Sequence, residues 1–127
     1  MRGQLNIGIF ILVFFLAVGL FSAVAIEKAC SPISGLLEQA GNVSAQGDSQ
    51  SAAMLVHSAR LQWQKNWHRI ALLADHSPMD EIDGLFAQTM AYADTKNPQE
   101  LSANCRRLAS LIDAVSEAHS LTWWNLI

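Results

Sequence analysis

The sequence predicts an all-α protein in which an N-terminal transmembrane helix is followed by a small antiparallel bundle of about four helices. Residues 7–26 carry no charged side chain and consist almost entirely of Ile, Leu, Val, Phe and Ala. The rest of the chain is rich in Ala, Leu, Gln, Ser and Glu, which favours helix over strand. Apolar residues recur there at helical spacing between short polar breaks.

The apolar segment sets the expected location. A helix over residues 7–26 is about 30 Å long, which matches the hydrocarbon core of a bilayer. Arg2 gives a positive charge before the segment, whereas the opposite charges of Glu27 and Lys28 cancel each other after it. Because positive flanks stay in the cytoplasm, we predict a signal-anchor over residues 1–29 in the cell membrane, with a cytoplasmic amino terminus. Residues 30–127 then form an extracytoplasmic bundle.

A secretory signal peptide is the alternative for this segment. Ala23-Val24-Ala25 fits the small-x-small pattern of a cleavage site, and cleavage after Ala25 would leave a secreted domain. The apolar run is longer than the 7 to 15 residues usual in signal peptides, so an uncleaved anchor is preferred. The downstream domain has helix-start signals of its own. We therefore expect the run to be a tether that the bundle does not need for folding.

Three prolines predict where helices begin, because each follows a residue that can cap a helix. Proline suits the first helical position, and a preceding Ser or Asn can accept a hydrogen bond from a free backbone amide. Asp80 and Glu100 lie at the third position of two of these helices and complete capping-box patterns. The three starts are Ser31-Pro32, Ser77-Pro78 and Asn97-Pro98.

Four helices follow from these starts and from the apolar spacing. We expect them over residues 32 to about 40 or 46, 50–74, 78–94 and 98–119, with a break at 47–49 and a tail at 121–127. Such short connections favour antiparallel neighbours. The predicted buried stripes are Ile33, Leu36, Leu37, Ala40 and Val43; Ala52, Val56, Ala59, Trp63, Trp67 and Ile70; Ile82, Leu85, Phe86 and Met90; and Leu101, Leu108, Leu111, Ile112 and Val115.

Short motifs in these helices resemble one family. They are Trp63-x3-Trp67, Asp75-His76-x3-Asp80 and the closing Asn125-Leu126-Ile127. The chain is similar in these motifs, and in its layout over nearly the full length, to the DUF4363 family. The resemblance implies a bacterial protein with one amino-terminal transmembrane helix and a helical domain. It implies no reaction.

Asp75, His76, Asp80, Glu81 and Asp83 form the one place where a histidine and several carboxylates gather. His76 and Asp80 are four residues apart and Asp83 is one turn further on, so the three are candidates for a divalent cation site. A helix that starts at Pro78 leaves His76 in the preceding turn, however. We therefore prefer a structural role, in which Ser77 caps the helix and the acids complement its positive N-terminal dipole.

The tryptophans occur as two pairs. Trp63 and Trp67 are four residues apart on an apolar stripe and are expected to pack in the core without forming a ligand site. Trp123 and Trp124 are adjacent, so on a helix they point about 100° apart and one thin bundle can hardly bury both. A docked tail is preferred for them, and contact with the membrane surface or with a partner is the alternative.

The two cysteines, Cys30 and Cys105, lack the spacing of a zinc site. Cys105 falls on an apolar stripe, so we expect small buried hydrophobic residues rather than a disulfide, although an extracytoplasmic domain would permit one. The net charge of −3, spread along the chain, provides no basic patch for a phosphate backbone, so no nucleic-acid binding is expected. No nucleophile, phosphate-loop or metalloprotease motif occurs, so neither enzyme activity nor a cofactor is expected.

The leading hypothesis is therefore a structural or protein-interaction role at the cell envelope. A single-pass anchor would hold the bundle close to a membrane or envelope partner. The second hypothesis is a metal-binding or small-ligand-binding module built on Asp75, His76, Asp80 and Asp83.

Overall fold

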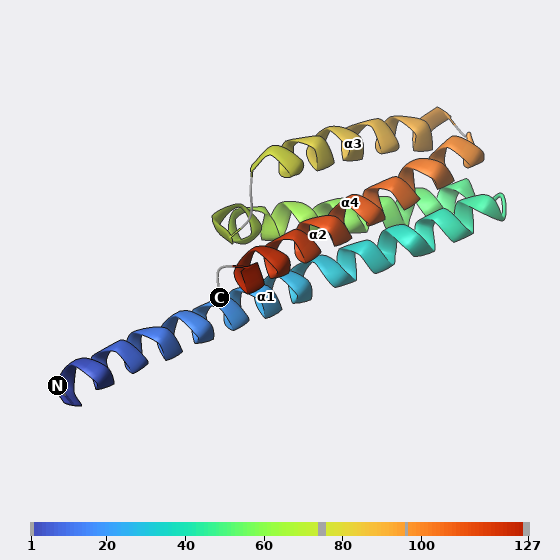
Figure 1. Cartoon of the computed structure of the whole chain (residues 1–127). Helices are drawn as coiled ribbons and strands as arrows, with labels where there is room; N and C mark the ends of the chain where they lie inside the picture. The colour runs from blue at the N-terminus through green and yellow to red at the C-terminus, as the bar shows by residue number, and fades with distance from the viewer. Residues whose placement is uncertain (1, 74–75, 96, 126–127) are drawn as a thin grey trace.

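The computed structural model describes residues 2–73, 76–95 and 97–125, with the side chains of 73, 76, 95 and 119–125 left aside. It contains four helices, α1 (Arg2–Ala45), α2 (Ser49–Leu73), α3 (His76–Thr95) and α4 (Pro98–Asn125), and the described residues include no strand. Successive helices run in opposite directions (Figure 1). In the described part, α1 packs against α2 and α4 but not α3. The predicted all-α antiparallel bundle is confirmed.

The predicted helix start at Pro32 is wrong. α1 is one helix from Arg2 to Ala45, with Pro32 in its interior and no break between residues 29 and 30. The end of the apolar run packs within the bundle, because Gly19, Ser22 and Ile26 are buried. That the bundle does not need this run for folding stays a prediction. The residues before Gly19 extend beyond the bundle as a free arm of α1 (Figure 1).

The buried stripe of α1 explains why the helix continues through Pro32. Ile26 and Cys30 precede Pro32 and Ile33 and Leu37 follow it, all in phase at steps of three or four residues and at most 1% exposed. A proline inside a helix costs about 3 kcal/mol, whereas burial of one large aliphatic side chain contributes about 1.5–3 kcal/mol. Pro32 itself is exposed, so the carbonyl that it leaves without a partner can be hydrated.

Replacement of Pro32 with alanine should therefore stabilise the protein. The change restores a backbone N–H for the carbonyl four residues earlier and removes a steric clash, and we expect the free energy of unfolding to rise by about 1–2 kcal/mol. Denaturation of the detergent-solubilised full chain, followed by circular dichroism, measures this effect. A loss of stability would mean that Pro32 marks a real junction in α1.

The turn between α1 and α2 is fixed by local hydrogen bonds. Gly47 has a φ of 93°, its N–H donates to the carbonyl of Ser44 at 2.9 Å, and the N–H of Asp48 donates to that of Val43 at 3.2 Å. These bonds form a Schellman motif, in which glycine adopts the left-handed conformation. Asp48 then caps α2, because its Oδ1 accepts the N–H of Ser51 at 3.1 Å. The break predicted at 47–49 is confirmed in its place, although it covers residues 46–48 because α2 begins at Ser49.

The other predicted boundaries have mixed outcomes. Asn97 caps α4 as expected, with its Oδ1 accepting the N–H of Glu100 at 3.3 Å. α3 begins at His76 rather than at Pro78, so Ser77 lies inside the first turn and cannot be the cap. α4 continues to Asn125 and includes most of the expected tail.

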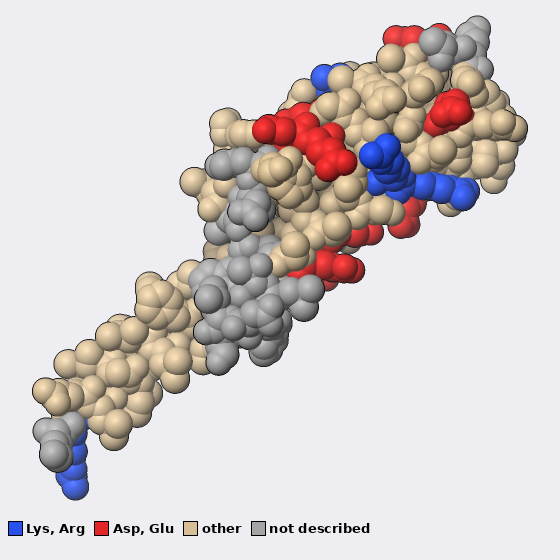
Figure 2. Space-filling model, turned by 45° about the horizontal axis from the view of Figure 1, so that its top comes forward, with Lys and Arg blue, Asp and Glu red and all other residues tan. Residues whose placement is uncertain are grey.

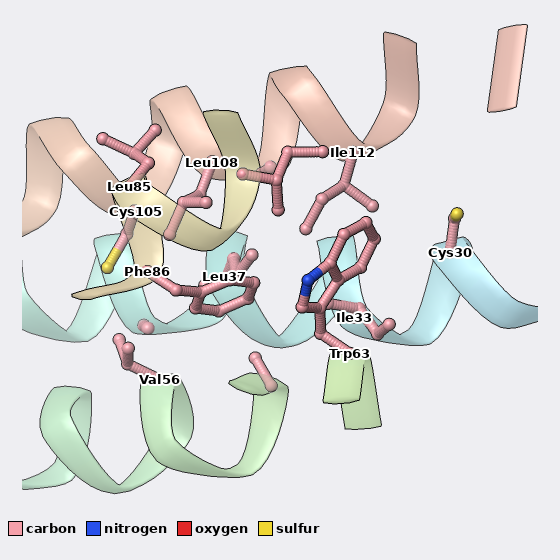
Figure 3. Packing of buried hydrophobic residues seen from close by; sticks show 14 of the residues in the cluster. Cys30, Ile33, Leu37, Val56, Trp63, Leu85, Phe86, Cys105, Leu108 and Ile112 are labelled. Atoms are coloured by element: carbon pink, nitrogen blue, oxygen red, sulfur yellow. The ribbon is translucent and has the colours of Figure 1, made fainter. Parts of the chain in front are cut away.

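The core follows the predicted stripes closely. All four helices contribute, and Trp63 lies among aliphatic side chains of the other helices (Figure 3). Met79 is fully buried as well, although the stripe predicted for α3 did not include it. The fully buried residues from the predicted stripes are Ile33, Leu37, Ala40, Ala52, Val56, Ala59, Trp63, Ile70, Ile82, Phe86, Leu101, Leu108 and Ile112.

α1 and α4 approach each other closely through small residues. The hydroxyl of Ser102 donates to the carbonyl of Gly41 at 2.9 Å, and that of Ser44 donates to the carbonyl of Pro98 at 2.7 Å. A Cβ atom on Gly41 would lie 3.3 Å from Cγ of Arg106 and 3.6 Å from Cβ of Cys105. Gly41 is thus the contact that allows the two backbones to come together, not the end of a helix.

Candidate functional site

One carboxylate joins the two core tryptophans. Nε1 of Trp63 donates to Oδ1 of Asp83 at 2.6 Å, and Nε1 of Trp67 donates to Oδ2 of the same side chain at 3.1 Å. Indole is a donor only and an ionised carboxylate is an acceptor only, so each group meets its complement. We call this arrangement the Trp-Asp-Trp clasp.

The clasp results from the periodicity of two helices. Trp63 and Trp67 are one turn apart on α2, so their rings lie on the same face. Asp83 follows the fully buried Ile82 on α3 and precedes Phe86, whose ring centroid lies 6.3 Å from that of Trp63. Trp63 is 1% exposed, and Trp67 and Asp83 are half-buried. The clasp therefore fixes α2 against α3 at the edge of the core.

A shallow cavity of about 330 Å³ opens beside the clasp. The ring of His68 stands edge-on to that of Trp67, with 5.5 Å between their centroids. The one carboxylate beside the tryptophans comes from α3, which the sequence pattern of α2 alone did not indicate, whereas the other polar side chains of the cavity belong to α2 itself. The cavity is lined by Arg60, Trp63, Gln64, Trp67, His68, Asp83 and Phe86.

The acidic cluster is not arranged as the sequence suggested. Because α3 begins at His76, Asp80 is its fifth residue and Asp83 its eighth, and the first turn of α3 contains no acid. The helix dipole acts mainly within the first turn, so the proposed complement to the dipole is wrong for Asp83. Its oxygens instead accept the two indole N–H groups. Glu81 reaches Arg107 of α4 at 3.8 Å on the exposed surface.

Several predicted site residues lie outside the described part. Asp75 and the side chain of His76 lie outside the described residues, so the structure does not test the metal hypothesis at these two positions. Among the described side chains, no group of three or more His, Cys, Asp and Glu residues is placed to hold a metal ion. The side chains of Trp123, Trp124 and Asn125 also lie outside, although their backbone forms the last turn of α4.

Cys30 and Cys105 are both buried free thiols. Cys105 lies against Gly41, and Gly41 is eleven residues from Cys30 along α1, a distance of about 16 Å. The two cysteines occupy opposite ends of the packed cluster in Figure 3. A disulfide requires Cα atoms within about 7 Å, so the preference for two buried thiols over a disulfide is confirmed.

Burial also controls the protonation of these thiols. It raises the pKa of Cys30 to about 11, with a smaller contribution from the charge of Asp113, and raises the pKa of Cys105 to about 11. In the unfolded chain the thiols titrate near 9.0. From about pH 9 to 11, therefore, the unfolded chain loses protons that the folded chain retains.

The free energy of unfolding should consequently fall as the pH rises from about 9 to about 11. Below pH 9 the contribution of the thiols is constant. Denaturation of the detergent-solubilised full chain at several pH values measures the slope. In the Cys30→Ala/Cys105→Ala variant the free energy of unfolding should fall less steeply with pH, because only the other titrating groups then contribute to the slope. Equal slopes in the two proteins would refute this role of the thiols.

Fold and clasp together define a four-helix bundle built on a long amino-terminal apolar helix. The chain belongs to the DUF4363 family, because the model of that family, described as a domain of unknown function, matches residues 20–126. The family resemblance seen in the Trp and Asp-His motifs is thereby confirmed. Comparison with curated proteins gives no match, and comparison with solved structures gives none.

Proposed function

We propose that the protein is a single-pass membrane anchor that holds its helical bundle outside the cytoplasm, where the bundle contacts another envelope component. The observation that carries the proposal is the free arm of α1. An 18-residue window in α1 has a mean hydropathy of 2.9 and is only 17% buried, unlike the core helix of a soluble protein. Figure 2 shows this arm as a surface with charge only at its tip, while the charged residues gather on the bundle.

Exposed apolar side chains cover this arm on all sides. They include Phe10, Phe14 and Phe15, each more than half exposed. A contiguous apolar surface of this kind is unfavourable in water and is typical of a membrane contact. A bilayer would cover it completely.

The continuity of α1 favours an anchor over a cleaved signal peptide. Cleavage after Ala25 would remove Gly19 and Ser22, both of which are buried, and would place a charged amino group on the buried Ile26. The match to the family also begins within the apolar run, at residue 20. We infer that the anchor is retained, and that it transmits the position of the membrane rigidly to the bundle.

Location and topology have direct tests. We expect the full chain to remain in the membrane after carbonate extraction and to keep the mass of the uncleaved sequence. An alkaline phosphatase fused after Ile127 should be active, because that reporter requires an extracytoplasmic location. Extraction into the soluble fraction, or an amino terminus at Ile26, would refute the anchor.

The interaction role requires a separate test. α2 carries Met54 and Leu61 on one outward face, 67% and 54% exposed. Confinement to the membrane raises the effective concentration of this face towards membrane partners. A photo-crosslinker at either position should capture the same envelope protein in native membranes. A photo-crosslinker at Gln39, an exposed residue of α1, should not capture it. Capture of different proteins, or of none, would refute the interaction role.

A further inference from the structure

A groove lies between α1 and α2 at the end of the bundle nearest the apolar arm. It encloses about 340 Å³ and has two chemically different parts. The apolar part is formed by Phe21, Val24 and Ala25, and the polar part includes Lys28 and Arg69. Phe21 is 77% exposed and Val24 46% exposed, so their side chains are open to the surroundings.

The groove lies at the level where α1 would leave the membrane. Lys28 is the second residue after the apolar run, and Arg69 faces the same stretch of α1 from the other side of the groove. α2 then ends in an apolar turn in which Leu72 is 85% exposed. An exposed leucine beside the membrane end of an anchor is more favourable in the lipid interface than in water.

The register of α4 shows how far the bundle extends along the apolar run. Glu27 and Cys30 of α1 line one cavity with Asp113 and Glu117 of α4. Eight residues further along α4 is Asn125, and because the helices are antiparallel its backbone is level with about Gly19. The last turn of α4, which contains Trp123 and Trp124, is therefore beside the apolar run. The bundle and the outer part of the span overlap by about 10 Å.

Charge distinguishes the two grooves at this end. On the α4 side, Glu27, Asp113 and Glu117 make the lining acidic. On the α2 side the two charged residues of the lining, Lys28 and Arg69, are both cations. Among the described residues the ion pair is between Arg107 and Glu81, which lie outside this groove. Lys28 and Arg69 thus have no carboxylate partner in the described part of the chain. Both side chains are exposed, so an anion from outside the protein can reach them.

We propose that this groove binds one anionic phospholipid from the surrounding leaflet. The phosphate lies between Lys28 and Arg69, and an acyl chain follows Phe21 and Val24 down the apolar arm. Guanidinium and ammonium groups both bind phosphate well, and long cationic side chains reach the headgroup level from apolar surroundings. This inference rests on the proposed membrane anchor and specifies which lipid the anchor prefers.

The test uses the full chain in nanodiscs that contain equal parts of phosphatidylglycerol and phosphatidylethanolamine. Native mass spectrometry after release should find one retained phosphatidylglycerol. Each cation near a lipid surface contributes about fivefold to binding, so Lys28→Gln/Arg69→Gln should weaken retention by about 25-fold. Free inorganic phosphate should not displace the lipid, because it lacks the acyl chain.

The matched control is Lys65→Gln/Arg106→Gln, which removes the same charge from exposed positions outside the groove. It should retain phosphatidylglycerol as the unchanged protein does. An equal loss in both variants, equal retention of the two lipids, or displacement by phosphate would overturn the proposal. If the unchanged protein is membrane-bound without lipid preference, only this inference fails. If it is recovered in the soluble fraction, the anchor fails too.

Discussion

Replacement of Asp83 with alanine is expected to lower the free energy of unfolding by about 3 kcal/mol or more. Asp83 accepts two indole N–H groups, and a hydrogen bond to a charged group contributes about 1.5–3 kcal/mol. The alanine variant leaves the N–H of the buried Trp63 without an acceptor, which adds a desolvation cost. Both near-ultraviolet circular dichroism of the tryptophans and denaturation of the full chain should report the loss.

Two comparisons separate the clasp from a general effect of charge. Asp83→Asn keeps one acceptor oxygen and should lose about half as much stability. Asp80→Ala removes an exposed carboxylate from the same helix and should change the free energy by at most about 0.5 kcal/mol. If Asp83→Ala were as mild as Asp80→Ala, the two hydrogen bonds would not stabilise the α2–α3 contact.

Replacement of Gly41 with leucine is expected to cost about 3 kcal/mol. Already a Cβ at Gly41 would lie 3.5 Å from the carbonyl oxygen of Ser102 and 3.6 Å from Cβ of Cys105, so the further carbons of leucine have no space. Overpacking of this kind typically costs 1–3 kcal/mol. It would also break the hydrogen bond from Ser102 to the carbonyl of Gly41. Thermal unfolding of the detergent-solubilised full chain measures the effect.

Gly35 provides the matched control on the same helix. A Cβ there meets nothing within 4 Å, so Gly35→Leu should stabilise the chain by about 0.5–1 kcal/mol through helix propensity alone. Gly41→Ala should be nearly neutral, because Cγ of Arg106 belongs to an exposed, flexible side chain that can move. Equal effects of leucine at the two positions would show that α1 and α4 are not in close contact at Gly41.

The sequence by itself determined the helical class, the antiparallel arrangement and most of the core. Apolar spacing depends on the 3.6-residue period, so Val56, Leu108 and their neighbours could be assigned to buried faces before any fold was known. Capping is equally local, and Asn97 was correctly identified because its acceptor and the amide of Glu100 are three residues apart. The apolar arm could be recognised from composition alone.

Tertiary structure alone decided the course of α1 and the formation of the clasp. Local rules end a helix near Pro32, but burial on both sides of it by α2 and α4 outweighs the cost of proline, and no local pattern contains that information. Asp83 is likewise twenty residues from Trp63, so only the packing of α3 on α2 brings the carboxylate to both indoles. The chain sets which faces are apolar, whereas the fold sets which polar groups meet across them.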